Sequence, residues 1–236
     1  AALGKMHVIP DTESSLGKER HHGFAERIDY EEFWHYLRKE RGCPPVEGHP
    51  DDPWRVVHLE KVQHALQHPL VTPSETGVPG NWGTLPHEDH QEFMVLNTWE
   101  KYLAQERENP FFTFVSFQSP HGPSLPPKEF TEPFLGDILL PDPPKEDMLQ
   151  HPIWHKSARI VDDAWRQEWL RYYYAFVLYT DWCVGEALRL LDESGQRDNT
   201  LVIYLSDHGD MGFNHGLIGK TQLYEESVRV PLAMHK

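Results

Sequence analysis

Residues 198–210 read DNTLVIYLSDHGD, in which a short apolar run ends in a polar turn. The run at residues 200–206 is rich in β-branched and aromatic side chains, and its length is typical of a central strand covered on both faces. Before it, residues 159–194 are predicted to form mostly one long helix, with Gly195 just beyond its end. Helices that alternate with such strands predict an α/β fold, with a mostly parallel central sheet flanked by helices.

A similar pattern occurs earlier in the chain. Residues 88–107 have helical spacing up to Asn109-Pro110, and residues 111–117 (FFTFVSF) are predicted to form a buried strand. In the long helix, Cys183 is predicted to be a small buried hydrophobe. Asp181 shares a face with apolar residues, so we expect a buried, hydrogen-bonded structural carboxylate. These apolar residues are Val177, Val184, Leu188 and Leu191.

The composition excludes several classes of protein. The chain has 236 residues, and 37 acidic against 22 basic side chains give it a net charge of −15, whereas nucleic-acid binding depends on clustered Lys and Arg. The mean hydropathy is −0.62, and no apolar run approaches the ~20 residues of a membrane span. The 8 Trp, 9 Tyr and 11 Phe are too much aromatic bulk for a disordered chain. We expect one globular domain, or most of one.

Both ends of the sequence look cut. It begins at Ala1 without an initiator Met, and residues 229–236 are a largely apolar run without a turn signal. We therefore expect a fragment of a longer protein, incomplete at both ends. The N-terminus consequently gives no indication of the compartment.

Asp207, His208 and Gly209 directly follow the apolar run. Ligands of α/β folds gather at the carboxyl ends of strands, and a carboxylate beside an imidazole can share one divalent cation there. The carboxylate favours Ca²⁺, Mg²⁺ or Mn²⁺, while the imidazole admits Zn²⁺. Two protein ligands are too few for any of these ions, so others must come from elsewhere. The alternative is a turn that satisfies Asp207 locally.

Two other segments carry candidate site residues near predicted strands. His121 follows the strand at 111–117 and lies between two prolines, so it can contact an anionic substrate or protonate a leaving group. A loop histidine without a role is the alternative. Lys5 and His7 are two residues apart, and in an extended segment their side chains would point the same way.

Lys220 follows Gly219 in a predicted loop, where its ammonium can reach a bound oxyanion. The spacing invites comparison with a phosphate-binding loop. Asn214 stands where that motif requires its first glycine, however, and the segment does not directly follow a strand. We therefore reject a phosphate-binding loop at this position.

Four segments taken together resemble the sulfatase family, within the alkaline-phosphatase superfamily. Residues 4–7 (GKMH) look like its G-K-x-H, and residues 117–127 (FQSPHGPSLPP) look like its P-H-x-P segment. Residues 173–206 resemble its long helix, its E-S-G-x-x-D-N-T turn and the strand that follows. Residues 206–232 (SDHGDMGFNHGLIGKTQLYEESVRVPL) resemble its D-[HN]-G-[DE]…G-K…Y-E-E-S-x-R-V-P stretch, the most specific of the four.

The resemblance implies a metal site and a sulfate-binding site. Asp207 and His208 would ligate one divalent cation, commonly Ca²⁺, with Mg²⁺ or Mn²⁺ as alternatives. The catalytic and substrate-binding residues implied are Lys5, His7, His121 and Lys220. The two lysines would bind the sulfate oxygens, the first histidine would hydrogen-bond the nucleophile, and the second would contact the ester.

The nucleophile of the family is a Cys in C-x-P-S-R that is converted to formylglycine. It lies upstream of G-K-x-H, as do the paired Asp residues that complete the metal site, so the resemblance places both before this chain begins. Cys43 begins a C-x-P sequence, but Ser and Arg are missing and the segment lies on the wrong side of Lys5. We do not expect it to be the nucleophile.

The resemblance makes residues 1–236 part of a sulfatase catalytic domain, with residues 8–87 and 122–160 as loops and insertions on the substrate side. It implies a metal-dependent sulfuric ester hydrolase acting on a small-molecule or carbohydrate sulfate ester. The alternative within the superfamily is a phosphonate monoester or phosphodiester hydrolase, which shares a histidine at position 208. A relative that binds anions or metal without catalysis is a further alternative.

Because the nucleophile is expected upstream, we predict that a purified protein of residues 1–236 has no sulfatase turnover. An assay with an aryl sulfate tests this expectation. Turnover above that of a heat-treated sample would contradict it.

Overall fold

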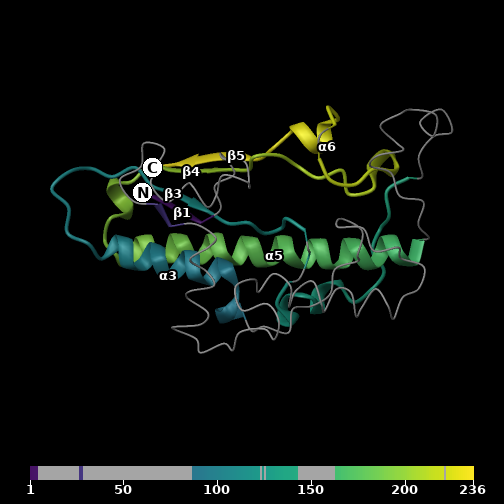
Figure 1. Cartoon of the computed structure of the whole chain (residues 1–236), viewed down its shortest axis with the longest axis horizontal. Helices are drawn as coiled ribbons and strands as arrows, with labels where there is room; N and C mark the ends of the chain where they lie inside the picture. The colour runs from purple at the N-terminus through teal and green to yellow at the C-terminus, as the bar shows by residue number, and fades with distance from the viewer. Residues whose placement is uncertain (5–26, 29–86, 123, 125, 143–162, 221) are drawn as a thin grey trace, which may run out of the picture.

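The computed structural model describes residues 1–4, 27–28, 87–122, 124, 126–142, 163–220 and 222–236. Two helices, α3 (Gln91–Leu103) and α5 (Asp163–Glu193), run beside each other, and the strands lie over them (Figure 1). In the described part of the chain, no helix has the length and apolar character needed to cross a membrane.

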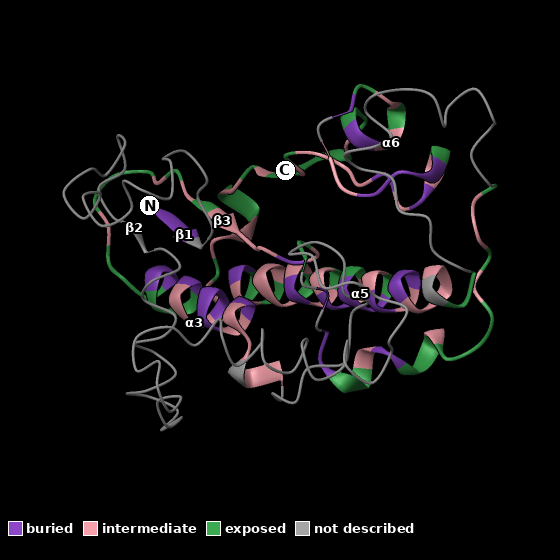
Figure 2. Cartoon of the chain, turned by 45° about the vertical axis from the view of Figure 1, so that its right-hand side comes forward, coloured by how far each residue is buried: buried purple, intermediate pink, exposed green. Residues whose placement is uncertain are grey.

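The two helices bury one side each, as amphipathic helices do. Phe176, Tyr179 and Cys183 of α5 pack with Leu96 of α3 in one buried cluster. Figure 2 shows buried residues recurring along both helices. Burial raises the pKa of the Cys183 thiol, which confirms its prediction as a buried hydrophobe.

The predicted helices are confirmed with shorter bounds. The segment predicted at 88–107 begins with a 3₁₀ turn at His87–Asp89 before α3, and the one predicted at 159–194 is α5. Gly195 follows α5 with a φ of 71°, a left-handed conformation that glycine adopts at little cost.

The buried face of α5 is not the predicted one. Asp181 is exposed and Val177 is 41% exposed, so the prediction of a buried Asp181 is wrong. The helix instead buries the face that carries most of its large aromatic rings. Aromatic side chains remove more apolar area from water than valines do, so this face packs against the neighbouring elements. The buried residues of α5 are Trp169, Leu170, Tyr172, Ala175, Phe176, Tyr179, Cys183 and Leu191. Leu191 is the buried member of the predicted face, whereas Val184 and Leu188 are only partly buried.

A three-stranded parallel sheet has the order β2-β1-β3. Its strands are β1 (Ala2–Gly4), β2 (Arg27–Ile28) and β3 (Phe114–Ser116). Gly4 is in register with Ser116, so β1 and β3 end at the same edge. The prediction of parallel strands is confirmed, but β3 is only partly buried because Phe114 is 39% exposed.

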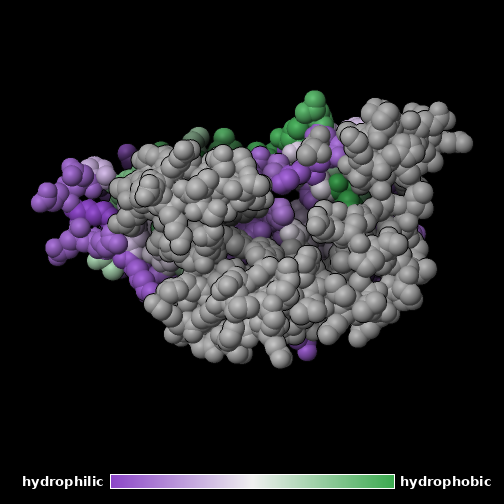
Figure 3. Space-filling view, in the orientation of Figure 1, coloured by the Kyte–Doolittle hydropathy of each residue, from purple (hydrophilic) through white to green (hydrophobic). Residues whose placement is uncertain are grey.

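Strands β4 (Val202–Leu205) and β5 (Leu232–His235) form an antiparallel pair. Val202 packs in the same core cluster as Leu3 of β1, so both sheets share the core above α3 and α5. The predicted strand at 200–206 thus exists, but Ile203 and Leu205 are about half exposed instead of covered on both faces. An apolar run shows which residues favour burial without showing what covers them. Figure 3 shows hydrophobic surface along the edge where β4, β5 and α6 lie.

Short elements connect these parts. They are one α-helical turn, α6 (Glu225–Val228), and 3₁₀ turns at Lys128–Phe130, Glu132–Phe134, Arg197–Asn199 and Asn214–Gly216.

Phe176 and its neighbour Val177 test the orientation of α5. We expect Phe176→Ala in the full-length protein to lower the free energy of unfolding by about 3–5 kcal/mol, because it leaves a cavity in the helix interface. Val177→Ala should change it by no more than about 0.5 kcal/mol. Urea denaturation measures both, and equal losses would contradict the assigned face.

Candidate active site

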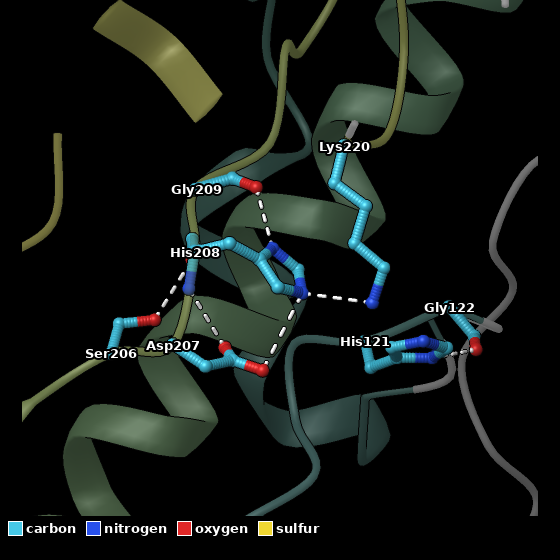
Figure 4. A network of polar contacts seen from close by, with 7 residues as sticks. All are labelled: His121, Gly122, Ser206, Asp207, His208, Gly209 and Lys220. Carbon is cyan, nitrogen blue, oxygen red and sulfur yellow. Dashed lines mark hydrogen bonds and ion pairs between the residues drawn. The ribbon is translucent and has the colours of Figure 1, made fainter. Parts of the chain in front are cut away.

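The candidate site begins where β4 ends. Ser206 is followed by Asp207 and His208, whose side chains are 80% and 32% exposed. Asp207 Oδ1 accepts a hydrogen bond from the His208 backbone N–H at 2.9 Å, and Ser206 Oγ donates to the His208 carbonyl at 2.9 Å. These local bonds orient the carboxylate and the imidazole toward the same side of the turn (Figure 4).

Gly209 is required here by a close backbone approach. A Cβ at this position would lie 2.0 Å from the carbonyl oxygen of Glu226, and the Gly209 N–H donates to the Ser227 carbonyl at 2.9 Å. Any larger residue would push this turn away from α6. The close approach to α6 thus accounts for the glycine at this position.

The hydrogen bonds of His208 determine which ring nitrogen carries the proton. Nδ1 lies 2.7 Å from the Gly209 carbonyl oxygen, which can only accept, so Nδ1 is the protonated nitrogen. Nε2 therefore presents its lone pair, and the Lys220 ammonium donates to it at 2.9 Å. The same Nε2 lies 3.6 Å from Asp207 Oδ2. The lone pair that a metal would use is thus held by Lys220.

Asp207 Oδ2 and His208 Nε2 are placed so that both can coordinate one cation. Ligands about 2.0–2.5 Å from the same ion lie roughly 3–4 Å apart, which includes the 3.6 Å separation of Oδ2 and Nε2. Within the residues that the structure describes, no group of three or more His, Cys, Asp or Glu side chains is arranged to hold a metal. The pair therefore accounts for only part of a metal site.

Asp210 closes the loop that brings Lys220 to His208. Its Oδ1 accepts from the N–H groups of Gly212 at 2.9 Å and Gly219 at 3.1 Å, and the Met211 N–H donates to the Gly219 carbonyl. Burial raises the pKa of Asp210, although these hydrogen bonds and the nearby Lys220 charge oppose the shift. The sequence argument gave Asp210 no role; its place next to the Asp-His pair was the available signal.

His215 lies on the same loop but serves a different contact. Its ring stacks on Tyr224 with centroids 4.4 Å apart, and its Nε2 lies 3.6 Å from Glu226 Oε1. These contacts join the loop to the segment that contains α6. They support a structural role for His215.

His121 reaches the site from the end of β3. Its backbone N–H donates to the Gln118 carbonyl at 2.9 Å. The Nδ1 atom of its ring lies 2.6 Å from the Gly122 carbonyl oxygen. The neutral ring therefore carries its proton on Nδ1. Figure 4 shows His121 next to the Asp207–His208–Lys220 group, on the side toward which the ammonium of Lys220 extends.

The structure thus brings together four of the six predicted site residues. Lys5 and His7 lie outside the described residues, as do Cys43 and most of the predicted substrate-side loops. Gly4, which immediately precedes Lys5, ends β1 beside the end of β3.

Comparison with known proteins identifies the family of the chain. A sequence model of the sulfatase family matches residues 1–236. The chain belongs to the sulfatase family. It is 25% identical to an arylsulfatase of Clostridium perfringens over 99% of the chain and 48% of that protein. It is 27% identical to a choline-sulfatase of Rhizobium meliloti over 98% of the chain and 44% of that protein.

The solved structures show the fold that this sulfatase-family chain shares. The phosphonate monoester hydrolase of Agrobacterium radiobacter matches 78% of the chain and 41% of its own length, with a TM-score of 0.58 and 21% identity. The one from Silicibacter pomeroyi has a TM-score of 0.59 and 20% identity over the same shares. The predicted α/β fold is thereby confirmed. The chain spans about half the length of the curated relatives named above.

Lys220→Met tests the competition for His208 Nε2. We expect the full-length variant to bind Ca²⁺ about tenfold more tightly, because a positive charge and a hydrogen bond no longer oppose the cation. Isothermal titration calorimetry measures the affinity, and Lys101→Met on the exposed side of α3 is the control. Unchanged or weaker binding would show that Lys220 does not compete.

Proposed function

We propose that the full-length protein containing this chain is a metal-dependent sulfuric ester hydrolase, which cleaves an S–O bond of a sulfate monoester. The Asp207 and His208 donor pair, in contact with the Lys220 ammonium, is the observation that carries the proposal. Its support is that the whole chain belongs to the sulfatase family.

In this proposal Asp207 Oδ2 and His208 Nε2 would hold one divalent cation, which would replace Lys220 as the partner of Nε2, with Ca²⁺ favoured over Mg²⁺ and Mn²⁺. The ion would supply Lewis-acid stabilisation of the negative charge on the sulfate oxygens. Ligands beyond this pair, and the formylglycine nucleophile, belong to the segment expected upstream.

Lys220 and His121 act on the ester itself in this proposal. The Lys220 ammonium donates to a sulfate oxygen and so stabilises charge that develops in the transition state. The protonated His121 ring donates from Nε2 to the ester oxygen as the S–O bond breaks, while Nδ1–H keeps its bond to the Gly122 carbonyl. The alcohol then leaves in neutral form.

Lys5 and His7 complete the proposed site from the neighbouring strand end. They follow β1, which ends in register with β3, the strand that leads to His121. Lys5 would bind a sulfate oxygen and His7 would hydrogen-bond the nucleophile. We retain residues 1–236 as part of the catalytic domain, with 8–87 and 122–160 on the substrate side.

The substrate proposed is a small-molecule or carbohydrate sulfate ester. One relative is named a choline-sulfatase and another an ulvan-active sulfatase of Formosa agariphila. A structure of similar fold, with a TM-score of 0.50, holds D-glucosamine-2-N,6-O-disulfate as its substrate. The exposed Asp207 and His121 side chains suit an ester that enters from solvent.

A phosphonate monoester or phosphodiester hydrolase is the second candidate. The specific observation in its favour is His208, because the resemblance associates histidine at this position with such enzymes. A relative that binds anions or metal without catalysis is the non-enzymatic alternative.

Hydrolysis of matched aryl esters by the full-length protein separates these candidates. We expect kcat/KM for 4-nitrophenyl sulfate to exceed that for the corresponding phosphonate and phosphodiester. Chelation with EDTA should abolish turnover, and Asp207→Ala should lower it at least about 100-fold because a metal ligand is lost. Asp198→Ala, an exposed carboxylate just before β4, is the control.

A preference for the phosphonate or phosphodiester would favour the second candidate. No turnover of any ester by the metal-supplemented protein would favour the non-catalytic alternative.

A further inference from the structure

Glu92 is a buried carboxylate that none of the roles above uses. It lies in the first turn of α3 and is only 1% exposed. Its Oε1 accepts a hydrogen bond from the Ser119 backbone N–H at 2.9 Å and another from Gln91 Nε2 at 2.9 Å. A side chain of α3 thus accepts a hydrogen bond from the backbone of the loop after β3.

This contact holds the loop immediately before His121. Ser119 is two residues upstream of His121, and the backbone N–H of His121 donates to the Gln118 carbonyl. Gln91 Nε2 also donates to Gln118 Oε1 at 3.0 Å. The first turn of α3 therefore binds the two loop residues on which the backbone position of His121 depends.

Glu92 does not have the surroundings of an ordinary core residue. Its Oε2 is buried and makes no hydrogen bond in the structure, and its charge contributes to the raised pKa of the Cys183 thiol, which is chiefly due to burial. An apolar residue would avoid the cost of burying a carboxylate. It would also leave the Ser119 N–H without the hydrogen-bond acceptor that α3 supplies.

We propose that Glu92 is a positioning residue for His121. By accepting the Ser119 N–H from the first turn of α3, it fixes the loop so that the imidazole is held at the ester oxygen. This inference rests on the proposed function, in which His121 contacts the ester. Glu92 does not touch the substrate and acts only through His121.

Two substitutions in the full-length protein distinguish the effect of the length of the Glu92 side chain from the effect of its charge. Glu92→Asp keeps the charge but shortens the side chain by one CH₂, so its oxygen no longer reaches the Ser119 N–H. Glu92→Gln keeps the reach and an oxygen acceptor but removes the charge. We expect kcat on an aryl sulfate to fall about tenfold in the Asp variant, with KM little changed, and to stay within about threefold in the Gln variant.

A double-mutant cycle tests whether the effect passes through His121. In a His121→Ala background, Glu92→Asp should lower kcat by less than about twofold. Glu100→Gln, on the exposed side of the same helix, is the control and should leave kcat unchanged. A wild-type kcat in Glu92→Asp, or a full tenfold loss in the His121→Ala background, would overturn the proposal.

Amide hydrogen exchange makes the outcome independent of the assigned reaction. In Glu92→Asp the Ser119 amide should exchange at least about tenfold faster than in wild type, while the amides of α5 keep their protection. If the wild-type protein hydrolyses no sulfate ester but Ser119 behaves in this way, the proposed function fails and the hold on the loop stands. Unchanged exchange at Ser119 would overturn the positioning role whatever the activity.

Discussion

The aromatic face of α5 packs against α3, and the other described parts are placed relative to this helix pair. Phe176, Tyr179 and Cys183 meet Leu96 in one cluster, and the indole N–H of Trp99 donates to the Ala187 carbonyl at 3.0 Å. Both sheets rest on this layer through Leu3 and Val202, which share a core with Trp99. The strand ends that carry the candidate site therefore take their positions from this largely apolar interface.

The candidate site itself depends on backbone groups more than on pairs of side chains. The Gly209 carbonyl selects the tautomer of His208. The backbone N–H groups of Gly212 and Gly219, which donate to the Asp210 carboxylate, close the loop that carries Lys220. A buried carboxylate from α3 likewise holds the loop before His121 through an amide. Backbone donors and acceptors move only when the chain moves, so such bonds hold reactive side chains in place better than mobile surface pairs do.

Local patterns in the sequence predicted the elements and the principal residues. The helices and the strand at β4 follow from periodicity and apolar runs, and Asp207, His208 and Lys220 follow from their place at a strand end and in a loop. The buried face of α5 did not follow, because apolar residues occur on several sides of so long a helix and the partner decides between them. Glu92 was missed because an acid in the first turn of a helix is ordinarily an exposed residue that complements the helix dipole.

The antiparallel pair β4–β5 presents Ile203, Leu205, Leu232 and Met234 to solvent, each about half exposed or more. Exposed apolar strands are surfaces on which identical molecules associate. At neutral pH the net charge of −15 repels one copy of residues 1–236 from another. Near the isoelectric point of about 5.4 this repulsion disappears. The colloidal stability of a preparation of this chain is therefore set by the acidity of its buffer.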